Sequence, residues 1–255
     1  MQSSTYNFSP IGFIRSAFKE KFGVPRQSLM MSRSVGILKL NPDPKYRLAV
    51  ADLENFSHLW VIFIFHFHFD DSWKPSITPP RVDGPKKVGV FASRSPYRPN
   101  PIGMSALKID RIDLEAPGGI EIHLSGLDLL DGTPVLDIKP YLPYADRIDD
   151  ANSGWVPAET RKYPVSFSEV SLEKIHTLTN KENPNLQEFL VQVLELDPRP
   201  TSLRRHYPIE LPNTKRRMFG FRMMNFEIKF ETHEGRIHVL DILPFKNWPS
   251  RGPAS

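Results

Sequence analysis

The stretch SRSPYRPNPIG, residues Ser93–Gly103, places two arginines among three prolines. Each proline fixes its own φ angle and biases the residue before it towards extended backbone, so the loop is stiff before any ligand binds. Arg94 and Arg98 therefore carry permanently charged guanidinium groups on a rigid support, which favours recognition of a carboxylate or phosphate. Two other interpretations stay open: PYRP fits a minimal PxxP ligand for a partner domain, and the stretch fits a rigid loop between strands.

A second candidate is the turn at the start of LDGTPVLDIKPYLPYAD, residues Leu130–Asp146. Asp131 and Gly132 form a turn dipeptide, and Thr133 and Pro134 then lead into a strand. Such a turn exposes backbone N–H and C=O groups, which can read the edge of an adenine together with the Thr133 hydroxyl. An ordinary hairpin turn explains the same residues.

The segment HFHFD brings His66, His68 and Asp70 to alternate positions, as in some metal sites. Aromatic neighbours and the lack of a further group of ligands argue against a metal, and we predict none. The chain has no cysteine, which excludes disulfides, thiolate metal sites and a cysteine nucleophile. It also lacks GxGxxG, Walker A, GxSxG and HExxH motifs.

The first part of the chain is expected to be mainly β. Short β-branched or aromatic runs alternate with Gly, Pro and Asp turns, which favours a barrel or a sandwich. The expected strands are Ser34–Leu40, Leu59–Phe69, Lys87–Ser93, Ile102–Leu114, Gly119–Leu127 and Pro134–Leu142. If Leu59–Phe69 is one strand, His66 and His68 share the face that is not wholly apolar.

The pattern changes after a polar, aperiodic stretch at residues 146–163, where we expect a domain boundary. Helical spacing then follows at Leu186, Phe189, Leu190, Val193 and Leu194. The strand-like segments NFEIKFE and IHVLDILPF come after it. We predict a main domain at residues 1–150 and a small α+β domain at residues 160–250.

Charge and hydropathy place weaker limits on function. The 255 residues carry a formal net charge of +4, with basic clusters in Arg199–Pro208 and Thr214–Phe219. Basic residues beside aromatic ones suit RNA binding, although solvated loops look the same. The N-terminus lacks the apolar run of a signal peptide and no apolar run is long enough to span a bilayer, so we expect a soluble, cytoplasmic protein.

Five motifs together carry a family resemblance. KFGVPRQ, FSHLWVIFIFH, GVFASRSPYRPNPIGMS, LDGTPVLDIKPYLPYAD and LELDPRP occur in that order. The chain closely resembles the TrmO (YaeB, TsaA-like) family of tRNA methyltransferases over nearly its whole length. The resemblance implies a TsaA-like single-sheet β-barrel that binds S-adenosylmethionine, a small C-terminal domain for tRNA recognition, and a homodimer. The implied reaction is N6-methylation of adenosine 37 in tRNA that already bears N6-threonylcarbamoyl (t6A), giving m6t6A beside the anticodon.

The resemblance also implies a set of cofactor contacts. They are Pro25, Arg26, Gln27, His66, Phe67, Arg94, Leu124, Leu127, Asp131, Gly132, Thr133 and Pro134. Bacterial relatives are expected to have a polar residue after the histidine that corresponds to His66, whereas this chain has Phe67. Phe67 could therefore contact the cofactor through its backbone or by stacking, but not through a polar side chain. Arg94 suits the cofactor carboxylate, and the Asp131 turn suits its adenosine.

The acceptor nitrogen is amide-like, so a protein group that removes its proton would help the reaction. Asp197 and Asp137 are the candidates, and loss of the proton to water without a dedicated base is the alternative. Arg199, Arg204 and Arg205 are expected to bind phosphates of the anticodon stem-loop and to help recognise the threonine carboxylate.

Two rival functions remain at this point. A noncatalytic RNA-binding barrel would bind tRNA whether or not Arg94 and S-adenosylmethionine are present. A protein-interaction module would use the proline-rich loop as its ligand. Neither explains why the PRQ, RSPYRPNPIG and DGTP motifs occur together.

Overall fold

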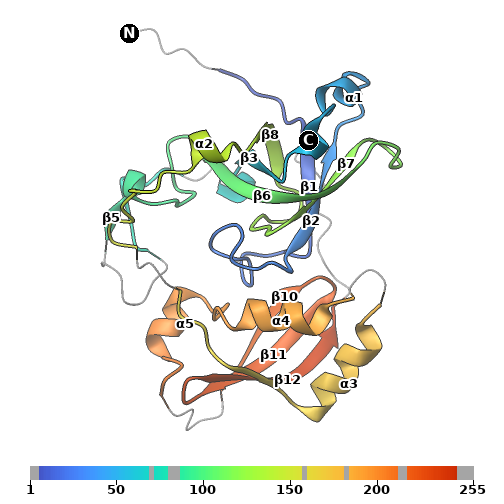
Figure 1. The fold of residues 1–255 in the computed structure, drawn as a ribbon. Coiled ribbons are helices and arrows are strands. Elements are labelled where there is room, and N and C mark those ends of the chain that lie inside the picture. The colour runs from blue at the N-terminus through green and yellow to red at the C-terminus, as the bar shows by residue number, and fades with distance from the viewer. Residues whose placement is uncertain are drawn as a thin grey trace.

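In a computed structural model, the chain forms a β-barrel above a second, smaller sheet (Figure 1). The structure describes residues 6–68, 72–79, 87–156, 160–180, 184–211 and 217–245. No helix within these ranges is long and apolar enough to cross a membrane.

Six antiparallel strands close the barrel in the order β1-β2-β7-β6-β3-β8, which confirms the expected mainly β, single-sheet barrel. Their bounds are β1 Gly12–Ser16, β2 Val35–Leu40, β3 His58–Ile64, β6 Ile102–Asp113, β7 Glu121–Ser125 and β8 Pro134–Pro140. Period-two alternation fills the interior: Leu59, Val61 and Phe63 of β3 are buried while their neighbours are half-buried. Short helices α1 (Lys45–Ala49) and α2 (Pro143–Asp146) lie outside the barrel wall.

Two expected strands are shorter than the sequence pattern indicates. The run Leu59–Phe69 leaves the sheet after Ile64 and forms a 3-10 turn at His66–His68, which the His68 amide closes on the Phe65 carbonyl at 2.8 Å. The run Lys87–Ser93 contains only β5 (Val88–Gly89), paired with β4 (Ser76–Ile77), and then a 3-10 turn at Val90–Ala92. The prediction that both histidines lie on one strand face is therefore wrong.

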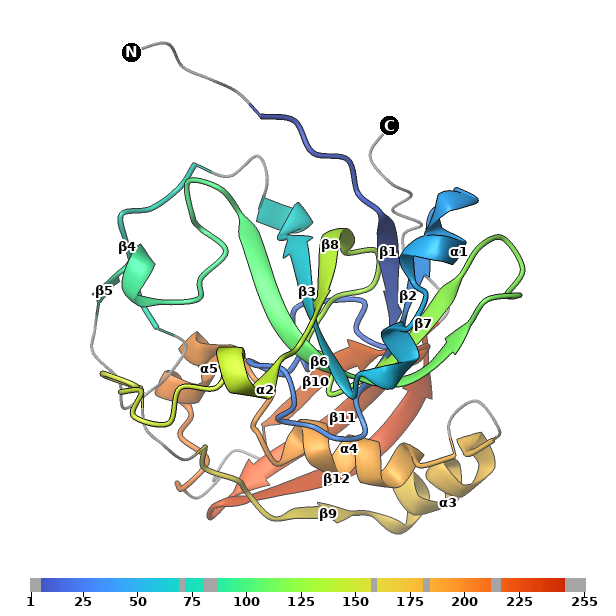
Figure 2. The same cartoon turned by 45° about the horizontal axis from the view of Figure 1, so that its top comes forward.

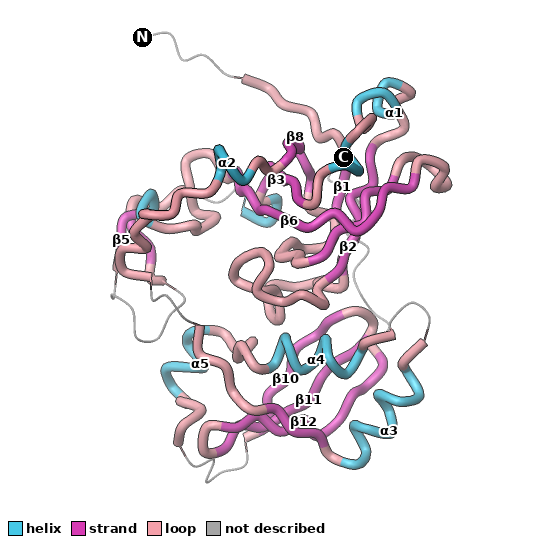
Figure 3. Tube along the Cα trace, viewed as in Figure 1, coloured by secondary structure: helices cyan, strands magenta, loops and turns pink. Residues whose placement is uncertain are grey.

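The second sheet has the order β10-β11-β12-β9. Its strands are β9 Val165–Phe167, β10 Met218–Met223, β11 Phe226–His233 and β12 Arg236–Pro244. Helices α3 (Glu169–Leu178), α4 (Leu186–Leu194) and α5 (Thr201–His206) accompany them (Figure 3). All five apolar residues predicted for the helix are buried in one core with the sheet, which confirms the helical spacing.

The loop between β1 and β2 joins the two parts of the molecule (Figure 2). Phe18 and Met31 of this loop are buried in the core formed by α4 and β10–β12, and the Phe18 ring lies edge-on to Phe189 with centroids 5.9 Å apart. The Met224 amide donates to the Ala17 carbonyl at 2.7 Å. The C-terminal sheet thus anchors a loop that also reaches the mouth of the barrel.

Candidate active site

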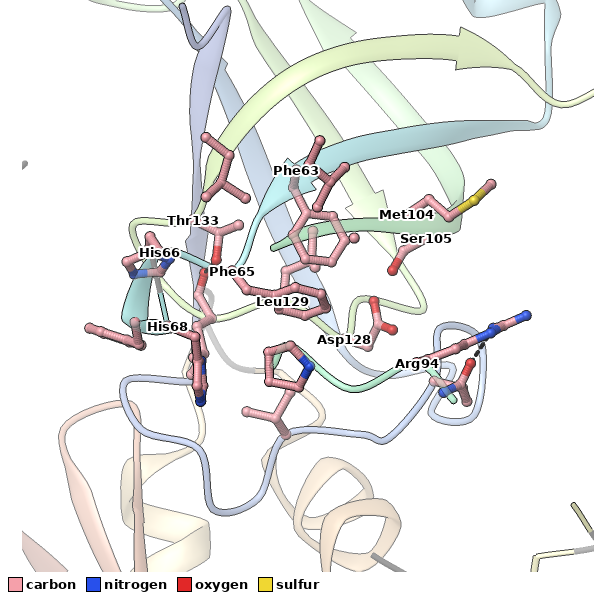
Figure 4. Close-up of a pocket in the computed structure, with 18 of the residues that line it drawn as sticks. Phe63, Phe65, His66, His68, Arg94, Met104, Ser105, Asp128, Leu129 and Thr133 are labelled. Carbon is pink, nitrogen blue, oxygen red and sulfur yellow. Dashed lines mark hydrogen bonds between the residues drawn. The ribbon is translucent and has the colours of Figure 1, made fainter. Parts of the chain in front are cut away.

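A cavity of about 510 Å³ lies where the β1–β2 loop meets one end of the barrel (Figure 4). Its walls come from Lys21 and Val24–Gln27 of this loop, the β3 end with the His66–His68 turn, the proline-rich loop, the start of β6, and the segment before β8. Segments far apart in the sequence therefore converge on one space of the size that small-molecule sites usually have.

The cationic side of the cavity comes from the proline-rich loop. Arg94 is exposed, lines the cavity and donates a hydrogen bond to the Gln27 side-chain oxygen. Arg98 also lines the cavity, but its guanidinium donates to the Ser93 and Val90 carbonyls at 2.7 and 3.2 Å. Arg94 is thus the arginine with a side chain presented to a ligand, whereas Arg98 braces the loop.

Pro25, Arg26 and Gln27 line the same cavity. Pro25 is buried, and the Gln27 amide nitrogen donates to the Arg26 carbonyl at 2.6 Å. Because the loop is anchored at Phe18 and Met31 in the other core, it can hold these residues against the barrel.

The histidine turn forms the opposite side. Burial lowers the pKa of His66 below its usual value, so this imidazole is neutral at neutral pH, and the Phe67 ring stacks on it with centroids 4.1 Å apart. His68 Nε2 lies 2.9 Å from Lys21 Nζ, and Tyr97 packs against the His68 ring. These contacts hold the turn in place.

The DGTP turn contributes less surface to the cavity than the sequence suggests. Thr133 lines it, whereas Asp131, Gly132 and Pro134 do not. The amides of Asp131, Gly132 and Thr133 donate to the carbonyls of Phe18, Ile14 and Leu130, so they are used within the protein. The Asp131 carboxylate pairs with Lys19 at 2.6 Å and accepts from the Ser16 amide at 2.9 Å.

The apolar wall comes from other leucines than those named from the sequence. Leu124 and Leu127 are fully buried in the barrel core and do not line the cavity. Leu129 and Leu130 line it instead, with Phe63 and Phe65, whose rings meet edge-on with centroids 5.1 Å apart.

Asp128 is a cavity residue that sequence reasoning missed. Burial raises its pKa to about 6, against the opposing effects of hydrogen bonding by Ser105 and the backbone and of the nearby Arg94 charge. No local pattern marks it, because a single acidic residue between Leu127 and Leu129 is also typical of a solvated position.

The remaining candidates lie outside the cavity. Asp137 sits on β8 and pairs with Lys139 at 2.8 Å. Asp197 and Arg199 are buried together in the C-terminal part, where Arg199 Nε and Nη2 each lie 2.8 Å from an Asp197 oxygen. Because both side chains are buried in this ion pair, neither Asp197 nor Arg199 is accessible to a substrate.

Arg204 and Arg205 lie on α5, half-buried and exposed respectively. In Figures 1 and 2, α5 lies on the same side of the molecule as α2 and the β4–β5 region. Asp70 and residues 214–216 of the second basic cluster lie outside the described residues, and within them no three His, Asp or Glu side chains are placed to hold a metal.

Comparisons with known proteins match most of the chain to one family, the tRNA-methyltransferase O family. Family models described as the tRNA-methyltransferase O N-terminal domain and the TrmO C-terminal domain match residues 13–147 and 160–245. The tRNA (adenine(37)-N6)-methyltransferase of Escherichia coli K12 is 43% identical over 198 residues, which is 77% of this chain and 83% of the relative.

Two further matches span nearly the full length. A Pseudomonas aeruginosa protein named as a candidate S-adenosylmethionine-dependent methyltransferase, RcsF, is 38% identical over 239 residues, 93% of this chain and 98% of its own. The crystal structure of TrmO from P. aeruginosa aligns with a TM-score of 0.75 and 35% identity, over 95% of this chain and 99% of that one.

Proposed function

The chain belongs to the tRNA-methyltransferase O family and is an S-adenosylmethionine-dependent tRNA (adenine-N6)-methyltransferase, and we propose that its substrate is t6A at position 37. The product is then m6t6A beside the anticodon. We further propose that the enzyme acts in the cytoplasm as a homodimer.

The observation that carries the proposal is the cavity itself. One side of it carries the charged Arg94 and the other the neutral His66 and Thr133, just as the amino-acid end of the cofactor is charged and its adenosine end is neutral. Figure 4 shows His66 and Thr133 on one side and Asp128 and Arg94 on the other. S-adenosylmethionine is a zwitterionic amino acid joined through a sulfonium to adenosine. The side with Arg94 suits the amino-acid end, and the side with Thr133, beside the Leu129–Leu130 wall, suits the adenosine.

The residues present also tolerate the positive sulfonium. His66 is neutral because burial lowers its pKa, and Phe63 and Phe65 present rings to the same space. Aromatic rings attract cations, so this wall does not repel the sulfonium. When bound, S-adenosylmethionine supplies the methyl group.

The chain's own residues then contribute mainly by positioning. Transfer requires in-line approach of the acceptor nitrogen, and holding two reactants in that geometry removes several kcal/mol of barrier. Asp137 and Asp197 are both held in ion pairs outside the cavity. We therefore propose that the N6 proton leaves to water without a dedicated base.

We propose that the tRNA lies along the face that carries α5. Arg204 and Arg205 are the basic residues of this helix, which is on the side of the β4–β5 region in both views. They would contact phosphates of the anticodon stem-loop, and part of their role is recognition of the threonine carboxylate. Arg199 is itself buried, so it would contribute to tRNA binding only indirectly, by holding the turn that precedes α5 in position.

Nucleoside mass spectrometry tests the proposal. Purified protein and S-adenosylmethionine are incubated with t6A-bearing tRNA or with an unmodified transcript, and a gain of one methyl is expected on t6A alone. Methylation of unmodified adenosine 37 would refute the substrate, and no product on either would refute the reaction.

Matched variants connect the product to the cavity. Arg94→Ala is expected to abolish methylation, whereas Arg47→Ala removes an exposed arginine on α1 that pairs with Glu115 and is expected to leave it unchanged. Sedimentation equilibrium of the wild-type protein tests the homodimer.

A further inference from the structure

Asp128 has an unusual setting for an acidic residue. It lies between the core residues Leu127 and Leu129, and its carboxyl faces the cavity between Ser105 and Arg94 (Figure 4). Within the part of the chain that the structure describes, the buried Oδ1 has no hydrogen-bond partner. A buried acceptor without a donor is costly, and such groups in native proteins usually await a ligand or a water.

The neighbouring guanidinium of Arg94 does not donate a hydrogen bond to Asp128 Oδ1. Arg94 acts on Asp128 through its charge, but the hydrogen bond of its guanidinium goes to Gln27. Ser105 on β6 and Ser28 in the β1–β2 loop are the polar neighbours that lower the pKa of the carboxyl, but neither donates a hydrogen bond to Oδ1. The missing partner is therefore a donor from the cavity, and a cationic donor would best compensate the buried charge.

The amino-acid end of the cofactor has such a donor in a fixed place. Its carboxylate and its ammonium are attached to the same carbon, so a residue that binds one places the other within a few ångströms. Resting on the proposed function, in which Arg94 binds the carboxylate, we propose that Asp128 accepts a hydrogen bond from the α-ammonium of S-adenosylmethionine. Arg94 and Asp128 then form a matched pair for the zwitterion.

This role makes binding depend on pH. The ammonium is bound by the charged carboxylate, so affinity is lost as Asp128 is protonated. With a pKa of about 6 in the free protein, the wild type is expected to bind about tenfold more weakly at pH 5 than at pH 7.5. Arg94 is charged throughout this range, so it does not contribute to the pH effect. His66 lies on the adenosine side of the cavity, so its protonation would change the affinity of every ligand that carries the same adenosine by the same factor.

The test compares two ligands by isothermal titration calorimetry. S-adenosylhomocysteine carries the α-amino group, whereas its desamino analogue keeps the carboxylate and the adenosine but lacks that group. Asp128→Asn is expected to weaken S-adenosylhomocysteine by ~10- to 100-fold, the usual size for a charge-assisted hydrogen bond, and to leave the desamino analogue unchanged. The tenfold pH effect should disappear in the variant and with the analogue.

Asp113→Asn is the matched control. Asp113 lies on β6 as Ser105 does, about 27 Å further along the strand, and pairs with Arg111 at the surface. It removes one acidic charge without touching the cavity, so its affinities should equal those of the wild type.

Three results would overturn the inference. Equal weakening of both ligands by Asp128→Asn would mean that Asp128 only shapes the cavity. Unchanged S-adenosylhomocysteine affinity with lost methylation would place Asp128 on the acceptor side, as a group acting on tRNA. Failure of the wild-type protein to bind S-adenosylhomocysteine would remove the proposed function and this inference with it.

Discussion

The buried pair Asp197–Arg199 provides a test of what the C-terminal arginines do. The two side chains are only 4% and 2% exposed, and Arg199 also donates to the Tyr207 carbonyl at 3.0 Å and to Thr232 at 3.3 Å. Its guanidinium lies over the Phe219 ring, 4.8 Å from the centroid. Arg199 therefore connects the turn before α5 to the sheet.

Arg199→Ala leaves the Asp197 carboxylate buried and without its partner. Removing one member of a buried ion pair costs ~3–5 kcal/mol, and the two lost hydrogen bonds to Tyr207 and Thr232 fall within that cost. We expect urea denaturation, followed by circular dichroism, to show a free energy of unfolding lower by this amount. The double variant Asp197→Asn/Arg199→Met, which leaves no charge buried, is expected to recover much of the loss.

The opposite pattern would refute this account of Arg199. If Arg199→Ala lost less than about 1 kcal/mol, in the range of surface ion pairs, while tRNA affinity fell, Arg199 would be an RNA contact. Arg205→Ala serves as the comparison, because Arg205 is exposed on α5 and its loss is expected to weaken tRNA binding with little change in stability.

Three further predictions follow from the barrel and its anchor. Burial raises the pKa of Asp128 to about 6, from 3.8 for an ordinary aspartate, so the folded state holds this proton more tightly than the unfolded state does. The resulting stabilisation is complete below pH 3.8 and is lost as the pH rises through 6. Urea denaturation should therefore show Asp128→Asn to be up to ~3 kcal/mol more stable than the wild type at pH 8 and equal to it near pH 3.5. Gly103→Ala places a Cβ atom in steric clash with Phe63 Cζ, so this cavity-lining ring must move and cofactor binding measured by calorimetry should weaken. Gly89→Ala, whose new methyl group has no atom within 4 Å, should leave binding unchanged. Phe18→Ala should cost ~3–5 kcal/mol of unfolding free energy, and an unchanged value would contradict the role of this residue as an anchor between the two parts.

Periodic residues made much of the fold predictable. The runs at β2, β6, β7 and β8 alternate as strands, and Leu186–Leu194 repeats as a helix, because each must bury one face. The short strand β1, Gly12–Ser16, was not predicted: its five residues carry too little pattern to be recognised without its partners β2 and β8.

The site was predictable only where a local motif decides the geometry. The proline-rich loop presents Arg94 because its stiffness is encoded in the prolines themselves. Tertiary contacts decided the rest: the DGTP amides are used by Phe18, Ile14 and Leu130, and the histidine pair sits on a turn that closes on Phe65.

Asp128 illustrates the same limit. A single acid between leucines reads as a solvated position, and only the closure of the barrel shows that its carboxyl is buried against a cavity. Likewise, nothing local indicates that Phe18 and Met31 belong to the core of the C-terminal sheet, since a loop residue reaches another core only once both parts are folded.

The central claim is that the cavity bounded by Arg94, Gln27, His66 and Thr133 is the cofactor site. A crystal structure of the protein with S-adenosylhomocysteine tests it most directly. We predict ligand density inside this cavity, with the carboxylate within hydrogen-bond distance of Arg94 and the adenine against Leu129 and Leu130. Density elsewhere, such as in the second cavity lined by Phe22, Arg217 and Phe219, would contradict the account.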